Sequence, residues 1–144
     1  AALLPEIRFL IVGLSDQDRG ELQSRSTENV SLFGYVSREE LLAFYQEARV
    51  YCQLSYRESF GMALAEAMAC GCMQVGTRRG AIPEVVGDAG YYVPYGSAKA
   101  TAEAIEKALC SKKGIGSRKR VEERFSLRRR EEALQSLLKS LMNS

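Results

Sequence analysis

Short apolar runs alternate along this chain with longer stretches in which apolar residues recur every three or four positions. The runs are typical of buried strands, and the stretches are typical of amphipathic helices. Because parallel strands need a crossover connection, this alternation predicts an α/β fold with a parallel sheet flanked by helices. The expected strands are residues 7–12, 30–33, 50–54, 73–75 and 89–93, and the expected helices include 19–26, 61–69 and 98–110.

Residue types exclude several kinds of chemistry. The 144 residues contain no histidine, which removes imidazole bases, Ser-His-Asp triads and histidine-containing zinc sites. The 20 Lys and Arg residues nearly balance 18 Asp and Glu, so a general nucleic-acid binder is not expected. No apolar run approaches the length of a membrane span. The cysteines lack the regular spacing of a disulfide framework, and we expect reduced thiols used as small core residues in a cytoplasmic protein: Cys52, Cys70, Cys72 and Cys110.

Serine residues mark two further helix starts. Ser37 and Glu40 form the S-x-x-E capping box, which predicts a helix beginning at that point. Ser126 precedes a last helix whose apolar stripe is Leu127, Leu134, Leu138 and Leu141. Between them, residues 112–130 hold nine Lys or Arg and two Glu. This segment is either a solvated helix surface or a peripheral contact with anionic lipid. Its one aromatic residue, Phe125, does not make the interleaved pattern of aromatics and charges expected of a nucleic-acid site.

The stretch from Ser55 to Gly71 carries most of the chemical information. It consists of a strand end, a loop with Glu58, a glycine at 61, and a helix that carries Glu66. Gly61 leaves room for a ligand to approach the backbone, and the first helical turn offers N–H donors to a phosphate. These donors belong to Met62, Ala63 and Leu64. On these features alone, the alternative is an ordinary strand-turn-helix with two solvated glutamates.

Two further groups of charged loop residues can each be interpreted in two ways. Asp16-Gln17-Asp18 imitates a D-x-D metal motif, but aspartates at this position also suit a helix cap, and we expect no metal. Arg57, Arg78 and Arg79 follow strands and could face a phosphate or remain solvated.

The order of motifs resembles one known family, the retaining GT-B glycosyltransferases of family 4. The run from Glu58 to Gly71, E-S-F-G-M-A-L-A-E-A-M-A-C-G, is similar to the family pattern E-G-F-G-x-x-x-x-E-A-M-A-C-G. The runs G-A-I-P-E-V-V-G-D-A-G at 80–90, N-V-S-L-F-G-Y-V at 29–36 and R-F-S at 124–126 also match, in the family's order, across about residues 7–142. The resemblance implies a Rossmann-like domain that binds a nucleotide-diphosphate sugar.

The resemblance also implies residue roles. Glu58 would be the catalytic residue, holding hydroxyls of the donor sugar and placing negative charge near its anomeric carbon. Glu66 would accept hydrogen bonds from the ribose. The remaining donor-binding positions would act through the main chain: Ser59, Phe60 and Gly61 along the sugar, Met62, Ala63 and Leu64 at the diphosphate, and Gly34 and Val36 around the base.

The family pattern finally suggests what residues 1–144 represent. They would form one domain, the C-terminal donor-binding half, truncated at its N-terminal side. The family's acceptor-binding domain, and the first strand and helix with their phosphate-binding Arg and Lys, would lie upstream. The partners implied are a nucleotide sugar and a sugar or lipid-linked acceptor, with no cofactor. Two alternatives stay open: a non-catalytic nucleotide-binding partner subunit of the same fold, or a nucleotide-sugar epimerase.

Overall fold

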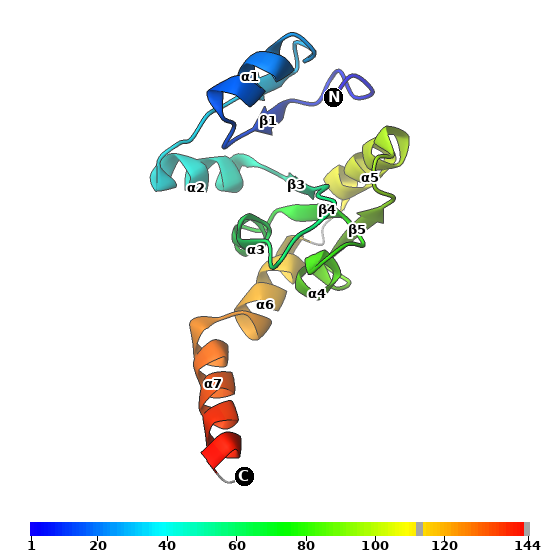
Figure 1. The fold of residues 1–144 in the computed structure, drawn as a ribbon. Coiled ribbons are helices and arrows are strands. Elements are labelled where there is room, and N and C mark those ends of the chain that lie inside the picture. The colour runs from blue at the N-terminus through cyan, green and yellow to red at the C-terminus, as the bar shows by residue number, and fades with distance from the viewer. Residues whose placement is uncertain (112–113, 143–144) are drawn as a thin grey trace.

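A computed structural model describes residues 1–111 and 114–142 of the chain. Strands and helices alternate along it (Figure 1). The strands are β1 (Phe9–Ile11), β2 (Val30–Leu32), β3 (Val50–Gln53), β4 (Met73–Thr77) and β5 (Gly90–Val93). The helices are α1 (Asp16–Gln23), α2 (Arg38–Glu47), α3 (Met62–Ala69), α4 (Ile82–Val86), α5 (Ala98–Cys110), α6 (Gly114–Arg124) and α7 (Leu127–Met142).

Every strand pair is parallel, which confirms the predicted α/β class. The strands nevertheless form two sheets, β1-β2 and β3-β4-β5, where the sequence predicted one. Within the described residues, β1 does not pair with β3. Figure 1 shows β1, which pairs with β2, on the β3 side of the larger sheet.

The core is built around β4, which is buried along its whole length. One cluster packs Met73 and Val75 against α5, and a second packs Leu64 and Met68 of α3 against α4. Helices on both sides explain why β4 is buried on both faces rather than alternately buried and exposed. Two of its buried residues, Gln74 and Thr77, are polar. The Gln74 Nε2 donates to the Cys72 carbonyl (2.8 Å), while its buried Oε1 has no partner.

Serine caps fix several helix starts. The predicted capping box is present, since Ser37 Oγ accepts from the Glu40 amide (3.2 Å) and the Glu40 carboxylate accepts from the Ser37 amide (2.9 Å). These bonds lower the pKa of Glu40, because they favour its charged form. The helix predicted at 19–26 begins earlier, as α1, because Ser15 rather than an aspartate caps it.

Helix α6 falls in the segment predicted as a basic tail, and the sequence did not indicate that it packs into the domain. Ser117 is buried and donates to the Ala89 carbonyl (3.1 Å), while Val121 and Phe125 join the core beside α3 and α4. Arg120 donates to the carbonyls of Val85 (2.8 Å) and Glu84 (2.7 Å). The first two residues of the predicted basic segment, 112 and 113, lie outside the described residues.

Helix α7 points away from the rest of the domain and buries none of its residues (Figure 1). The predicted stripe is therefore exposed: Leu127 by 82%, Leu134 by 49%, Leu138 by 59% and Leu141 by 66%. No helix of the described residues has the length and apolar character needed to cross a membrane.

The four cysteines are free thiols, and two of them pack in or against the core as predicted. Cys72 is buried, and burial raises the pKa of its thiol to about 11. Cys70 is half-buried and packs against the same cluster. The prediction was wrong for Cys52 and Cys110, which are exposed on the edge strand β3 and at the last residue of α5.

Candidate functional site

Glu58 is held by side chains that extend from β3. Gln53, the last residue of that strand, donates from Nε2 to Glu58 Oε2 (3.0 Å) and to Ser55 Oγ (2.6 Å). The Tyr51 hydroxyl donates to Gln53 Oε1 (3.0 Å), which turns the amide nitrogen toward the glutamate. The Ser59 amide donates to the other carboxylate oxygen of Glu58 (3.1 Å). The carboxylate is therefore oriented before any ligand binds.

The loop after β4 supports Glu58 from behind. Gly80 packs directly on the Glu58 backbone, and a Cβ at position 80 would lie 2.3 Å from the Glu58 carbonyl oxygen. The Ala81 amide donates to that oxygen (3.0 Å), and Thr77 Oγ1 donates to the Ser55 carbonyl (2.9 Å). The β3–α3 and β4–α4 loops are thus joined at the carboxyl edge of the sheet.

Helix α3 begins directly after the β3–α3 loop, and no side chain caps its N-terminus. Gly61 is the N-cap residue and has φ +83°, a conformation that favours glycine. A Cβ there would meet Leu64 Cβ at 3.2 Å and Glu58 Cγ at 3.3 Å. Backbone conformation and packing within the chain therefore already favour glycine here, and the room for a ligand at Gly61 stays a prediction. Met62, Ala63 and Leu64 form the first turn as predicted.

Two tyrosines, the buried Tyr45 and the half-buried Tyr51, lie near the glutamates. Burial, followed by the charges of Tyr51, Glu66 and Cys70, raises the pKa of Tyr45, whose hydroxyl is within hydrogen-bonding reach of Glu66. Burial and then the charge of Glu58 raise the pKa of Tyr51 to about 12, with a smaller contribution from Glu66. Tyr51 thus remains a neutral donor for Gln53, and it lies within electrostatic range of both glutamates.

The sequence did not identify Gln53 or Tyr51 as part of this arrangement. Their only signal was the two-residue spacing on β3, which places both side chains on one face of the strand together with Ser55. The Phe60 ring packs edge-on against Phe125 (centroids 5.5 Å apart), and the main-chain contact expected of Phe60 stays a prediction.

Gly34 and Val36 follow the other sheet, at the carboxyl end of β2. The Gly34 carbonyl accepts from the Gly13 amide (3.0 Å), which ties the loop after β2 to the turn after β1. The structure brings Ser59, Phe60, Gly61 and the first turn of α3 together with Glu58. Among the described hydrogen bonds, none joins Gly34 or Val36 to that group.

The aspartates of the D-x-D sequence are occupied at the start of α1. Asp16 forms an ion pair with Arg19 (3.0 Å), and the Asp18 amide and carboxylate bond to Ser15. In the part of the chain that the structure describes, no group of three or more His, Cys, Asp or Glu side chains is placed to hold a metal ion.

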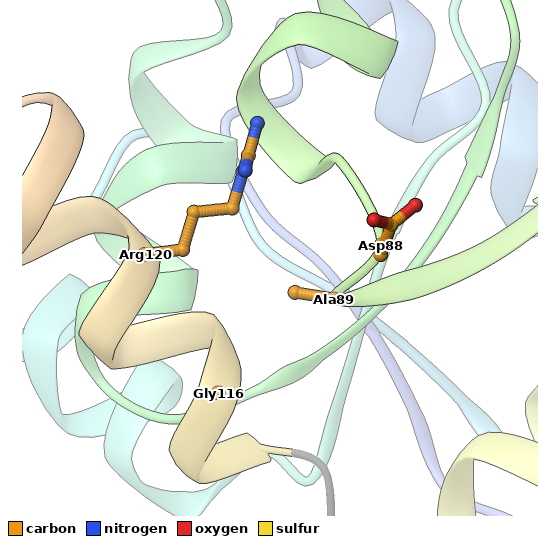
Figure 2. Close-up of a pocket in the computed structure, with 4 residues that line it drawn as sticks. All are labelled: Asp88, Ala89, Gly116 and Arg120. Carbon is orange, nitrogen blue, oxygen red and sulfur yellow. The ribbon is translucent and has the colours of Figure 1, made fainter.

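A surface hollow lies away from the glutamates (Figure 2). Its lining residues, Asp88, Ala89, Gly116 and Arg120, come from the amino side of β5 and from α6. Figure 2 shows Arg120 extending toward α4, where it binds carbonyl oxygens, while Asp88 points away from it. These groups serve packing of α6, so the candidate site is the opposite, carboxyl edge of the sheet.

A helix N-terminus without a side-chain cap, at the carboxyl edge of a parallel sheet, is an arrangement found in α/β domains that bind phosphorylated ligands at this edge. Comparison with known families makes the assignment more specific. Residues 1–126 match the family described as Glycosyl transferases group 1, and the chain belongs to this family.

Individual relatives agree with the family. The phosphatidyl-myo-inositol mannosyltransferase of Mycobacterium leprae is 34% identical over 108 residues, which are 72% of this chain and 29% of that protein. The D-inositol 3-phosphate glycosyltransferase of Mycobacteroides abscessus is 33% identical over 133 residues, 85% of this chain and 30% of the relative. Among solved structures, sucrose-phosphate synthase from Thermosynechococcus elongatus superposes with a TM-score of 0.81 and 27% identity, covering 99% of this chain and 41% of that one. The chain thus spans less than half the length of each of these proteins.

Proposed function

We propose that this chain is the C-terminal, donor-binding domain of a retaining GT-B glycosyltransferase of family 4. In this proposal it binds a nucleotide-diphosphate sugar, and the whole protein transfers a hexosyl group, such as mannosyl or glucosyl, to an acceptor. The observation that supports it most directly is the pre-oriented carboxylate of Glu58 beside the uncapped first turn of α3. Membership in a family of glycosyl transferases supports the same function.

The proposed mechanism depends on charge. As the bond to the leaving diphosphate breaks, positive charge develops at the anomeric carbon and negative charge develops on the phosphate. Glu58 stabilises the first, and the N–H groups of Met62, Ala63 and Leu64 stabilise the second. Glu58 is held by Gln53 and Ser59 as a positioned charge, and we assign it an electrostatic role rather than that of a covalent nucleophile. Glu66 binds the ribose, and the loop of Gly34 and Val36 surrounds the base.

The proposal also covers chain segments outside the structure. The first strand and helix expected upstream would place a parallel strand between β1 and β3, which do not pair with each other. A separate upstream domain would bind the sugar or lipid-linked acceptor. Docking of a cytoplasmic protein on anionic lipid through residues 112–130 belongs to the same proposal, and sedimentation with phosphatidylglycerol vesicles at low salt tests it.

Steady-state kinetics of the full-length protein separate binding from chemistry. Glu58→Gln keeps the size of the side chain but removes its charge, so kcat should fall by about 100-fold or more. Glu66→Ala removes a contact that changes little between ground and transition states, so it should mainly raise the donor KM. Near-normal kcat in Glu58→Gln would contradict the assigned role.

The same assay tests the expectation that no metal is needed. Activity should persist in EDTA, and Asp16→Ala should have little effect, because the helix N–H groups take the place of a metal at the diphosphate. Loss of activity with chelator and its recovery with magnesium or manganese would contradict this part of the proposal.

A further inference from the structure

Three neighbouring strand ends bring an arginine and two tyrosines together at the carboxyl edge. Tyr56 follows β3, Arg79 follows β4 and Tyr95 follows β5. The two rings meet edge to face with centroids 5.2 Å apart, and the Arg79 guanidinium lies 4.2 Å from the Tyr56 centroid and 5.3 Å from that of Tyr95. Both tyrosines are more than half exposed, at 55% and 53%. We call these three residues the arginine–tyrosine cluster.

Stacking leaves Arg79 with free hydrogen-bonding capacity. Ring contacts use the face of a guanidinium, whereas its N–H groups lie in its plane. Within the described residues, no ion pair engages Arg79. The rings therefore restrict the side chain while its donors remain open to solvent, which lowers the entropy lost when it binds an anion. A planar fork of this kind matches the oxygens of a phosphate.

Arg78, the neighbouring residue, is arranged differently. Its guanidinium lies 4.1 Å from the ring centroid of Tyr92, a half-buried residue of β5 whose hydroxyl donates to the Gly87 carbonyl (2.7 Å). That contact fastens the β4–α4 loop to the sheet. Of the two arginines, Arg79 is the one that lies among exposed rings.

The cluster lies beside Glu58 but on the side away from the proposed base loop. Gly80, adjacent to Arg79, packs on the Glu58 backbone. In the order β3-β4-β5, Arg79 and Tyr95 follow the second and third strands, whereas Gly34 and Val36 follow β2, whose partner β1 lies on the β3 side of this sheet (Figure 1). A donor that extends from Gly34 to Glu58 leaves the cluster free. A molecule that reaches the donor sugar from the other side would meet Arg79.

We propose that the arginine–tyrosine cluster is a subsite for a phosphate group carried by the acceptor, with Arg79 as its anion ligand and the Tyr56 and Tyr95 rings as its walls. This inference rests on the proposed function, in which Glu58 marks the position of the donor sugar. A soluble sugar or polyol phosphate and a phospholipid headgroup share this chemistry.

An NMR titration of the 144-residue chain tests the subsite with defined probes. Glycerol 1-phosphate represents the soluble source, and phosphatidylglycerol vesicles, compared with phosphatidylcholine vesicles, represent the lipid source. We expect shifts at residues 56, 79 and 95, and at least ~10-fold weaker binding for Arg79→Gln. Arg79→Lys keeps the charge but not the planar fork, so its affinity for the probes should lie between that of the unchanged chain and that of Arg79→Gln. Arg25→Gln removes the same charge from an exposed position after α1 and should bind like the unchanged chain.

The outcomes distinguish this inference from the proposed function. Arg79-dependent binding of either probe supports the subsite and identifies its source. No binding of either probe, or an equal loss in Arg25→Gln, would overturn it. UDP, titrated in parallel, reports the donor site: if Arg79→Gln weakens UDP as much as glycerol 1-phosphate, Arg79 belongs to the donor diphosphate and the inference is wrong. Arg79-dependent phosphate binding without any UDP binding would instead count against the proposed function alone.

Discussion

Gly80 is the residue on which the geometry of the candidate site depends most directly. It has φ +54°, and its missing side chain lets the loop after β4 lie against the Glu58 backbone. Gly96 offers a matched comparison, because it has φ +78° but no heavy atom lies within 4 Å of the place that a Cβ would take. Any side chain is strained at both positions, and only at 80 does it also collide with backbone.

We therefore expect Gly80→Ala to lower the free energy of unfolding far more than the control, Gly96→Ala, does. The control should lose about 1–2 kcal/mol from the left-handed conformation alone. Gly80→Ala should lose at least about 2 kcal/mol more, because the Glu58 carbonyl must move. Urea denaturation of the two variants measures the difference. Equal free energies of unfolding would show that the two loops separate without cost.

Gln53 is a positioning residue whose effect should appear in kcat. In the full-length protein, Gln53→Met keeps the volume of the side chain but removes the side-chain amide that donates to Glu58. We expect kcat to fall by about 10-fold with little change in donor KM, because a misplaced charge acts mainly in the transition state. Tyr51→Phe, which removes only the hydroxyl that orients the amide, should cause a smaller loss in the same direction.

Thermal unfolding of these two variants provides the control. A positioning role predicts that kcat falls while the unfolding temperature stays near that of the unchanged protein. A parallel decrease in both quantities, or a rise confined to KM, would assign Gln53 to folding or to donor binding instead.

At the scale of elements, α6 and α7 contrast strongly. Helix α6 is tied to the domain by Ser117, Arg120 and Val121, whereas α7 buries no residue. Much of the charge on both helices is paired within each helix, as in Arg118–Glu122, Lys119–Glu123 and Arg128–Glu132. Since exposed pairs of this kind contribute little, α7 adds little to the stability of the domain.

Removing α7 should therefore leave the fold intact. A chain ending at Ser126 should unfold within about 2 °C of the 144-residue chain, because no residue of α7 is buried. It should also lose any concentration-dependent association caused by the exposed leucine stripe. Calorimetry and sedimentation velocity check both results. A large drop in unfolding temperature would show that α7 packs on the domain in solution.

For the whole molecule, the sequence predicted what depends on local pattern. The apolar runs located all five strands among the described residues, and the S-x-x-E pattern located the start of α2. Helix α4 was missed because its five residues, which include Pro83, are too few to show a helical period, and α6 was missed because it is mostly polar. The division into two sheets was also missed, since strand pairing depends on contacts distant in sequence.

The sequence likewise predicted the part of the candidate site that is continuous along the chain and missed the rest. Glu58 and the first turn of α3 lie within one continuous motif, so the sequence indicated them together. The residues that hold Glu58 in place lie outside that motif: Gln53 and Tyr51 on β3, and Gly80 in the loop after β4. The arginine–tyrosine cluster joins three strand ends, and no spacing along the chain reveals that meeting.

The separation of β1-β2 from the larger sheet has a consequence for cooperativity. No residue of β1, β2 or α1 is buried, although Phe9 packs partly buried against the cluster of Met73 and Val75, whereas β4 is buried throughout. Local opening is favoured where little apolar surface is covered. Residues 9–32 should therefore behave as a separate unfolding unit whose amides exchange with solvent through low-energy openings, while those of β4 exchange only when the whole domain opens. A single unfolding free energy for the 144 residues would then describe the three-stranded half alone, and the smaller sheet would have a stability of its own.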